Sequence, residues 1–346
     1  MRIVVAIPRR RPMPLRPLLL AALLAASLPL TGCAGAFGPD HPPVAAAPVT
    51  DASFVMADGT RLPYRVWRPE DKPRAIILAL HGFNDSRDAW ELPAPAFAAQ
   101  GIEVIAPDQR GFGDTATRGY WPGTARLVAD ARRMTELIHQ AHPHTKLYLM
   151  GESMGGAVAI CLAASSDPGP VAGTILVSPA VWGRSEMNIF ERGGLWLMVH
   201  TLPGMRVTGS IVKVEASDNR AAIHRLSTDP LTIHRTRWDA VNGLVNLMDA
   251  ALADVGHMRG PALFLYGGKD ELIPKRAARK AMAGLPRGVR AAYYPPLHHL
   301  MLRDHEREEA IADILAWMSD PAGWLPSGAG ADARAWEADG ARRGEG

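Results

Sequence analysis

The sequence KLYLMGESMGGAVAICLAA, residues 146–164, joins an apolar strand pattern to an alanine-rich helix pattern through a serine flanked by glycines. Residues 146–150 have the apolar composition of a strand buried on both faces, and residues 155–164 have that of a helix. A sharp turn from strand to helix needs small residues beside a strained nucleophile, and Gly151 and Gly155 provide that room around Ser153. The stretch therefore predicts that Ser153 is a nucleophile exposed on a tight turn.

The same turn places the Ser153 hydroxyl at a helix N-terminus, where the positive end of the helix dipole favours developing negative charge. A glycine-rich loop between a strand and a helix can instead bind phosphate. No Lys or Thr follows the glycines, as a P-loop would require, so the nucleophile is the favoured interpretation.

Apolar runs alternate with helical patterns along most of the chain. The runs expected as strands are residues 75–80, 102–106, 146–150, 173–177, 261–266 and 289–294, preceded by two strands at 53–56 and 62–67 around a tight turn. Helical patterns lie at residues 89–100, 127–139, 155–164, 275–283 and 306–318. Alternation of this kind predicts an α/β fold with a mostly parallel central sheet and helices on both faces.

The alternation stops between residues 182 and 259, where helical patches occur without a convincing strand. We therefore expect a core formed by residues 51–181 and 260–320, with residues 182–259 inserted above the sheet. After Pro326 almost no apolar residue remains, so residues 321–346 are predicted to be a disordered tail.

The first 32 residues have the order of features of a secretory signal. Arginines without any acidic residue precede the apolar run 18–26, which is too short to span a bilayer. The following Leu30-Thr31-Gly32-Cys33 resembles the lipobox of bacterial lipoproteins. The resemblance implies a signal peptide over residues 1–32 and an acylated Cys33 as the mature N-terminus, attached stably to a membrane. The alternative is an ordinary cleavage site followed by a chance cysteine.

Residues 33–50 are rich in Ala and Pro and are expected to form a tether that holds the domain off the membrane. In bacterial lipoproteins a non-acidic residue after the cysteine, here Ala34, implies passage to the outer membrane, so we expect a lipid-anchored protein of the bacterial cell envelope. Without the leader, 33 of the 38 basic residues face 35 acidic ones, and the net charge of +3 becomes −2. A balance so close to neutral predicts no binding to nucleic acid.

A serine hydroxyl is a weak nucleophile at neutral pH and needs a base that a third group orients. In a fold of this kind, the acid and then the histidine follow the serine along the chain. Asp270 directly follows a strand pattern, and Glu271, one residue further on, is the competing acid. The last strand pattern is followed by His298 and His299, between which spacing alone does not choose. His305 lies nearer the final helix and is expected on the surface.

Five ordered motifs resemble the monoacylglycerol lipase and lysophospholipase branch of the α/β-hydrolases. They are Leu80-His81-Gly82-Phe83-Asn84-Asp85, Asp108-Gln109-Arg110-Gly111-Phe112-Gly113, the serine turn, residues 267–274, and His299-Leu300-Met301-Leu302-Arg303-Asp304. In that family the base histidine precedes an apolar trio and a basic–acidic pair, which selects His299 over His298. The resemblance, which covers about residues 51–318, also implies an oxyanion hole formed by the backbone N–H groups of Phe83 and Met154.

The resemblance further implies a serine hydrolase in which His299 accepts the proton of Ser153 while Asp270 holds the imidazole, and an acyl-enzyme forms on Ser153. The expected substrates are carboxylic esters, above all lipid esters with one long chain that are met at the membrane surface. An acyltransferase, a thioesterase or a short-chain carboxylesterase would use the same triad. An envelope lipoprotein that binds a ligand without catalysis belongs to a different class. Hydrolases of this fold with an Asp nucleophile are excluded by Ser153.

The insertion 182–259 occupies the position of that family's cap and carries many large apolar residues. They are Trp182, Met187, Ile189, Phe190, Leu195, Trp196, Leu197, Met198 and Val199. Such residues can cover an acyl-chain pocket or simply pack the cap onto the core, and both interpretations stay open. No cofactor and no metal are expected, because His142 and His144 in a turn make no closed site and Cys161 is expected to be a buried core residue.

Overall fold

The computed structural model describes residues 52–208 and 214–343. The predicted signal peptide, the lipidation site Cys33 and the tether over residues 33–50 lie outside these described residues. Within them, no helix combines the length and the apolar character that crossing a bilayer would need.

The described residues form a central eight-stranded sheet with the order β1-β2-β4-β3-β5-β6-β9-β10. The strands are β1 (Ser53–Val55), β2 (Arg61–Trp67), β3 (Ala75–Leu80), β4 (Ile102–Pro107), β5 (Lys146–Glu152), β6 (Gly173–Val177), β9 (Ala262–Gly267) and β10 (Arg290–Tyr294). Strand β2 pairs antiparallel with β1 and β4, and the pairs from β4 through β10 are parallel. The predicted α/β class with a mostly parallel sheet is confirmed.

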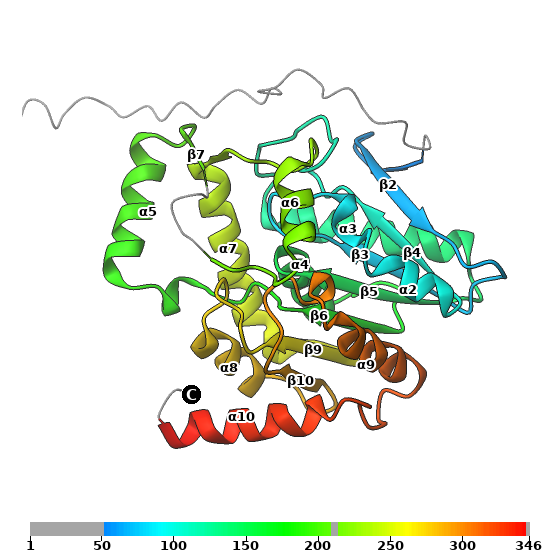
Figure 1. Cartoon of the computed structure of the whole chain (residues 1–346). Coiled ribbons are helices and arrows are strands. Elements are labelled where there is room, and N and C mark those ends of the chain that lie inside the picture. Colours follow the sequence, from blue (N-terminus) through cyan, green and yellow to red (C-terminus); the bar gives the residue numbers. More distant parts are fainter. Residues whose placement is uncertain (1–51, 209–213, 344–346) are drawn as a thin grey trace, which may run out of the picture. The chain divides into compact units, whose positions relative to one another are not determined.

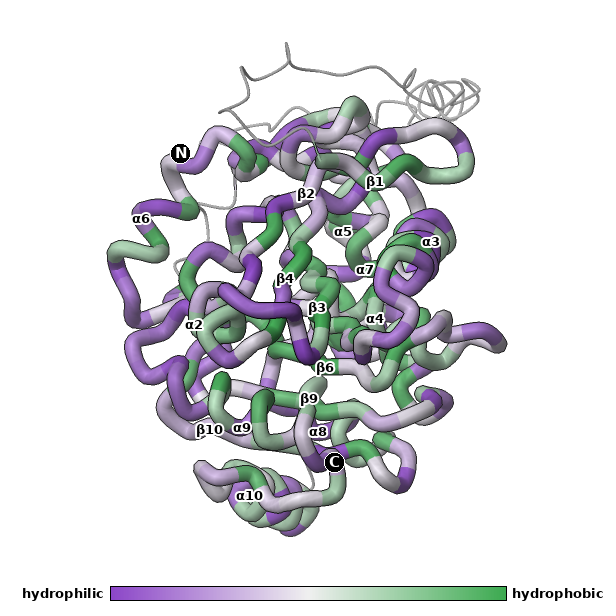
Figure 2. The backbone as a smooth tube through the Cα atoms, turned by 90° about the vertical axis from the view of Figure 1, so that its right-hand side faces the viewer, coloured by the Kyte–Doolittle hydropathy of each residue, from purple (hydrophilic) through white to green (hydrophobic). Residues whose placement is uncertain are grey.

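Two hydrophobic cores lie on opposite faces of this sheet. In β3, Ile76, Leu78 and Leu80 belong to one core, and the alternate residues Ala75, Ile77 and Ala79 belong to the other. The first core contains buried residues of α3 (Thr124–Ala141), α4 (Met154–Ala164), α7 (Trp238–Asp254) and α8 (Lys275–Ala283). The second contains residues of the 3-10 helix η1 (Arg87–Trp90), α2 (Ala94–Ala99) and α9 (Arg307–Ser319). Successive side chains of a strand point to opposite faces, so a continuous apolar run is what a doubly covered strand requires. Figure 2 shows the hydrophobic segments concentrated around β3 and α4.

An insertion separates β6 from β9 in the chain, and we call residues 182–259 the cap. It contains the 3-10 helix η2 (Arg184–Glu186), α5 (Ile189–Thr201), β7 (Arg206–Val207), α6 (Arg220–Thr228), β8 (Thr236–Arg237), α7 and the 3-10 helix η4 (Val255–His257). Strands β7 and β8 pair with each other in a small two-stranded sheet that the sequence pattern did not predict. Helix α5 begins with a capping box, in which the Asn188 side chain accepts from the backbone N–H of Glu191, and the Glu191 carboxylate accepts from that of Asn188.

The predicted disorder of residues 321–346 is wrong over most of its length, because residues Ala329–Arg343 form helix α10. Buried Ala329, Ala333, Trp336 and Gly340 recur at helical spacing, so a few small residues and one tryptophan suffice to give the helix a packing face. The Trp336 ring stacks on that of Tyr293 with centroids 4.6 Å apart. Figure 1 shows α10 beside β10, against which it packs.

Candidate active site

Ser153 lies between the end of β5 and the beginning of α4, with φ 52° and ψ −114°. A positive φ is strained for a residue with a Cβ, and such strain is typical of nucleophile turns. Residues 151 and 155 on either side of it must be glycines because there is no room for a side chain at these positions. A Cβ on Gly151 would lie 2.3 Å from the carbonyl carbon of Gly155, and one on Gly155 would lie 2.2 Å from the carbonyl oxygen of Leu80. Ser153 itself is half-buried among fully buried neighbours, so its hydroxyl is accessible.

His299 and Asp270 follow the neighbouring strands β10 and β9 and meet at the carboxyl edge of the sheet. The Nδ1 atom of His299 lies 2.8 Å from Oδ2 of Asp270, and both side chains are buried. The other carboxylate oxygen of Asp270 accepts from the backbone N–H groups of Leu272 and Ile273, each at 2.8 Å. Although burial lowers the pKa of His299, the charge of Asp270 and the hydrogen bond to it raise the pKa above its usual value.

The competing residues make other contacts. The Glu271 carboxylate is exposed and accepts from the backbone N–H of Glu215. His298 is buried and its Nδ1 lies 3.1 Å from Oδ2 of Asp304, whereas His305 is exposed. The geometry therefore pairs His299 with Asp270 and places the alternatives elsewhere.

Ser153 and His299 line the same cavity, which has a volume of about 730 Å³. Gly82, Phe83 and Leu300 line it from the core. Asn84, Asp85, Ala180, Leu272 and Ile273 of the core also line it. The largely apolar remainder of the wall comes from the cap and includes Trp182, Met187, Leu195, Met198, Trp238, Val241, Leu244, Val245 and Met248. The cavity therefore combines a hydroxyl and an imidazole with a largely apolar wall.

The turn Gly82–Asp85 lies next to the serine, because a Cβ built on Gly82 would be 3.5 Å from that of Ser153. The His81 side chain fixes the position of this turn through two hydrogen bonds. Its Nδ1–H donates to the Gly82 carbonyl at 2.7 Å, and its Nε2 accepts from the backbone N–H of Gln109 at 3.0 Å. Burial lowers the pKa of His81 to about 4, which keeps the ring neutral, as these two hydrogen bonds require. Met154 is fully buried at the first position of α4, where backbone N–H groups have no partner within the helix.

The loop after β4 braces the same region. Asp108 accepts from the backbone N–H groups of Arg87 and Asp114, at 2.7 and 2.8 Å, and forms an ion pair with the Arg87 guanidinium. Gly113 has φ 55°, and a Cβ there would lie 2.1 Å from Cγ of Asp108. Arg110 reaches Asp130 at 2.6 Å. These contacts give the loop a structural role, because they hold the segments around the site in place.

Arg303 is a residue whose role sequence reasoning missed. Its Nη2 donates to Asp85 at 2.6 Å and to Glu152 at 2.8 Å, so one buried guanidinium joins the turn after β3, the residue before Ser153 and the segment after His299. Burial raises the pKa of Glu152, and the charge of Arg303 opposes that rise. The signal was a single arginine directly after the apolar run 300–302, where an unpaired buried charge would be costly.

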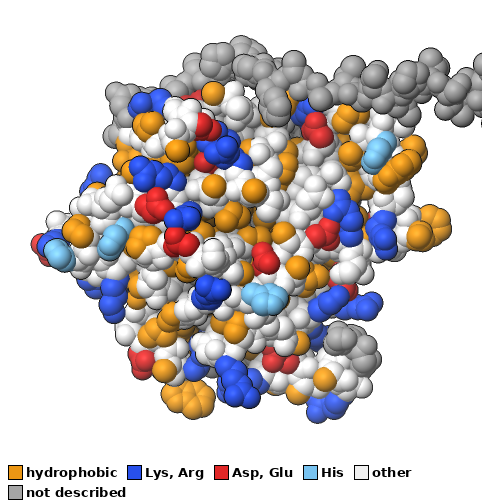
Figure 3. Space-filling model, turned by 180° about the vertical axis from the view of Figure 1, so that it is seen from behind, with side chains coloured by type: hydrophobic (Ala, Val, Ile, Leu, Met, Phe, Trp, Pro, Cys, Tyr) orange, Lys and Arg blue, Asp and Glu red, His pale blue; other side chains and the backbone are white. Residues whose placement is uncertain are grey.

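Helix α5 exposes an apolar stripe on its outer side. Phe190 is 86% exposed and Trp196 62% exposed, and Ile189 and Leu197 lie beside them at helical spacing. Figure 3 views the molecule from behind, where α5 lies at the right-hand edge and hydrophobic side chains project. Phe190 also lines the cavity, so the stripe is continuous with the cavity wall.

Among the described residues, Asp218, His298 and Asp304 form a group that could hold a metal ion. Hydrogen bonds within the group account for this proximity, since the two Asp304 carboxylate oxygens accept from the backbone N–H groups of Asp218 and His298. Cys161 is buried, and burial raises the pKa of its thiol, which disfavours the reactive thiolate.

Comparisons with known proteins agree with this architecture. A family model described as "Serine aminopeptidase, S33" matches residues 71–306, more than half of the chain. The chain is 24% identical over 273 residues to a monoacylglycerol lipase of Mycolicibacterium smegmatis, covering 78% of this chain and 96% of that protein. It is 29% identical over 229 residues to the human monoglyceride lipase, covering 65% and 75%. The solved monoacylglycerol lipase of Paleococcus ferrophilus superposes with a TM-score of 0.63 at 20% identity, over 75% of this chain and 99% of that one.

Proposed function

The chain belongs to the α/β-hydrolase family described as serine aminopeptidase, S33, and on that premise we propose that it hydrolyses esters of lipids that carry one acyl chain, such as monoacylglycerols or lysophospholipids. It is a serine ester hydrolase, as its relatives named monoacylglycerol lipase indicate. The observation that carries the proposal is the contact of His299 Nδ1 with Asp270, which leaves Nε2 as the base in a cavity that also contains Ser153.

In the proposed reaction, Nε2 of His299 accepts the proton of the Ser153 hydroxyl while the oxygen attacks the ester carbonyl. Asp270 fixes the imidazole tautomer and stabilises the imidazolium that forms. The backbone N–H groups of Phe83 and Met154 donate to the oxyanion, and each such donor contributes about 3 kcal/mol to transition-state stabilisation. The alcohol leaves with the proton from His299. Water, deprotonated by the same histidine, then attacks the acyl-enzyme and releases the fatty acid and free Ser153.

The cavity supports an acyl chain as the part of the substrate that is recognised. Its cap-derived wall is formed mainly by Trp, Met, Leu and Val side chains. Each methylene group of an acyl chain that is buried against such a wall contributes about 0.8 kcal/mol to the free energy of binding.

We also propose that the enzyme acts at a lipid surface. The exposed stripe on α5 adjoins the cavity and would place its entrance against the acyl region of a membrane or micelle. The lipobox-like Leu30–Cys33 supports anchoring through an acylated Cys33 in the bacterial cell envelope, at the outer membrane.

The proposal is tested with the purified full chain and a panel of substrates from short p-nitrophenyl esters to monoacylglycerols and lysophospholipids. We expect labelling of Ser153 by a fluorophosphonate probe and the highest kcat/KM on a long-chain ester, and Ser153→Ala serves as the unlabelled control. Product analysis with added alcohols and thiols separates hydrolysis from acyl transfer, and aminoacyl p-nitroanilides test the peptidase activity that the family description names. An unlabelled wild-type protein without ester turnover would refute the proposal.

A further inference from the structure

The turn that contains the Phe83 N–H group has one unusual backbone conformation, at Asn84. The backbone N–H of Asp85 donates to the Gly82 carbonyl at 3.3 Å, which closes a four-residue turn with Phe83 second and Asn84 third. Asn84 has φ 64°, as the third position of a type II turn requires. Glycine and asparagine are the residues that adopt this conformation most readily, so the turn depends on the residue at position 84.

The core holds this turn from one side. His81 and the backbone N–H of Asp85 both donate to the Gly82 carbonyl, and Arg303 donates to the Asp85 carboxylate. These contacts fix the first and last residues of the turn. Within the described part of the chain, the hydrogen bonds of the third residue, Asn84, do not come from the core.

The cap holds Asn84 from the other side. The backbone N–H of Ile233 donates to the Asn84 carbonyl at 2.8 Å. The Asn84 side-chain amide donates to the Thr236 hydroxyl at 2.6 Å. Ile233 and Thr236 both belong to the cap, and Thr236 lies in β8, so residues about 150 positions away complete the turn.

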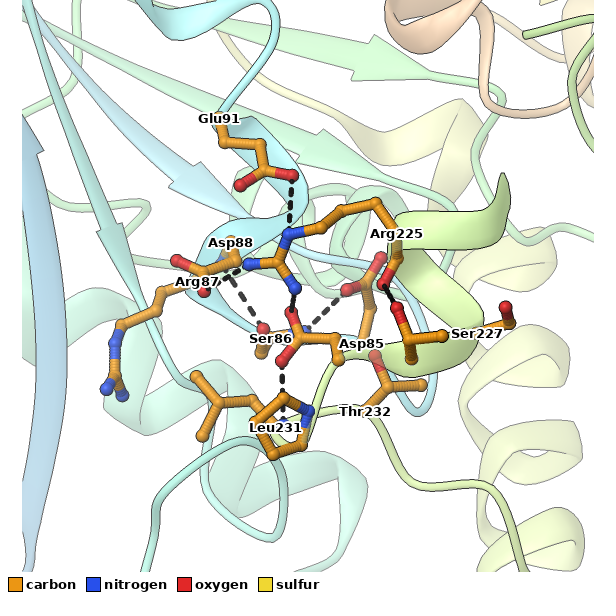
Figure 4. Close-up of polar contacts among 12 residues, drawn as sticks. Asp85, Ser86, Arg87, Asp88, Glu91, Arg225, Ser227, Leu231 and Thr232 are labelled. Atoms are coloured by element: carbon orange, nitrogen blue, oxygen red, sulfur yellow. Dashed lines mark hydrogen bonds and ion pairs between the residues drawn. The ribbon is translucent and has the colours of Figure 1, made fainter. Parts of the chain in front are cut away.

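A second tie keeps the cap over the same stretch of core. Arg225 of α6 lies 3.2 Å from Glu91, 3.3 Å from Asp88 and 3.1 Å from Asp229. Figure 4 shows its guanidinium reaching across from α6 to Asp88 and Glu91, whose segment follows the turn. Asp229 is the C-cap residue of α6 itself, so the tie to the core consists of the pairs with Asp88 and Glu91. Each partly exposed pair contributes little alone, but the two core carboxylates around one guanidinium help define the position of α6.

We propose that Asn84 is a positioning residue through which the cap sets the orientation of the Phe83 N–H donor. The inference rests on the proposed function, in which that N–H stabilises the oxyanion. An oxyanion donor works only when it points at the position that the developing charge will occupy, so a small rotation of the turn costs rate and not substrate affinity. The cap thus does more than enclose the acyl chain. Its contacts with Asn84 also orient the Phe83 N–H group that donates to the oxyanion.

Two substitutions remove the side-chain bond between Asn84 and Thr236 in different ways, and both keep the backbone bond from Ile233 to the Asn84 carbonyl. Thr236→Val keeps the shape of the side chain and removes the hydroxyl, and Asn84→Gly keeps the backbone conformation and removes the amide. We expect each to lower kcat by roughly tenfold with KM within about twofold, since a whole oxyanion donor is worth more than that. Thr236→Ser, which retains the hydroxyl, is expected to recover most of kcat. Thr228→Val removes an exposed cap hydroxyl bonded within α6 and is the matched control, with kcat unchanged.

Active sites are titrated with the fluorophosphonate probe, so kcat refers to folded molecules only. The pH at which kcat is half-maximal is expected to stay at its wild-type value in both variants, because the His299–Asp270 pair is untouched. Wild-type kcat in titrated Thr236→Val and Asn84→Gly would overturn the inference while leaving the proposed function intact, and so would a loss accompanied by a shifted pH midpoint. Absence of labelling and turnover in the wild-type protein would instead refute the proposed function.

Discussion

The Nη2 atom of Arg303 lies 2.8 Å from the carboxylate of Glu152, the residue immediately before Ser153. Replacing Arg303 with Met would leave Glu152 and Asp85 buried near each other without a counter-charge. Removing one partner from a buried ion pair costs about 3–5 kcal/mol, so we expect the free energy of unfolding of Arg303→Met to fall by that amount. Urea denaturation measures it.

Arg68→Met is the control for this change. Arg68 is largely exposed and lies 3.7 Å from Glu103, so its loss is expected to cost no more than about 1 kcal/mol. Equal stability of the Arg303→Met and wild-type proteins would show that the two carboxylates do not need the arginine.

The pairing of His299 with Asp270 predicts that removing the charge of Asp270 lowers kcat far more than removing the charge of the adjacent Glu271. Asp270→Asn is expected to lower kcat by about 10⁴-fold, because the imidazole loses the group that fixes its tautomer. Glu271→Gln is expected to keep kcat within about twofold, because Glu271 does not contact His299. Steady-state kinetics on one ester compares the two, and a larger loss in Glu271→Gln would reverse the assignment of the acid.

The raised pKa of His299 sets the pH dependence of activity. Burial lowers this pKa, but the charge of Asp270, the hydrogen bond to it and the charge of Glu152 together raise it above the ordinary value of about 6.5. The base must be neutral to accept a proton, so activity is lost as the pH falls through this pKa. We expect the acid-side midpoint of kcat/KM, measured between about pH 5 and 9, to lie above 6.5. A midpoint below 6.5 in a protein that circular dichroism shows to be folded would contradict this.

The packing of Trp336 predicts that helix α10 contributes to the stability of the fold. Its ring is buried, stacks on Tyr293 and Tyr266, and lies under the Arg279 guanidinium at 4.4 Å. We expect Trp336→Ala to lower the free energy of unfolding by about 3 kcal/mol. Trp324→Ala, at a tryptophan that is 83% exposed, should change it by less than about 0.5 kcal/mol. Equal effects of the two substitutions would argue that α10 is not part of the cooperative fold.

The sequence was sufficient for the central architecture because strands buried on both faces leave a strong signal. All six residues of β3 are buried, as its continuous apolar run predicts. The helix expected at residues 89–100 is divided into η1 and α2, because Pro93 precedes Ala94 and limits where the second helix begins. Side chains whose partners are distant in the sequence are not marked by any periodic pattern. Arg303 binds Asp85, which is 218 positions away.

The site was partly open to prediction for the same reason. The turn at Ser153 is a local feature, since its glycines and its positive φ lie within a few residues. The sequence favoured Asp270 over Glu271 because Asp270 directly follows the strand, but which carboxylate contacts His299 is a relationship in space that sequence spacing does not contain. Helix α10 was missed because composition alone suggested disorder, while the helical spacing of Ala333 and Trp336 was the available signal.

Strand β10 ends the sheet, so one row of its backbone N–H and C=O groups has no strand partner among residues 52–208 and 214–343. Helix α10 packs against this strand, and the opposite end of the sheet is a strand of only three residues, β1. Natural sheets protect their edges in these two ways. A proteolytic cut before Ala329 would therefore uncover a template on which a second cut molecule could add its own β10, and edge-to-edge aggregation would follow from the loss of a helix that is remote from Ser153.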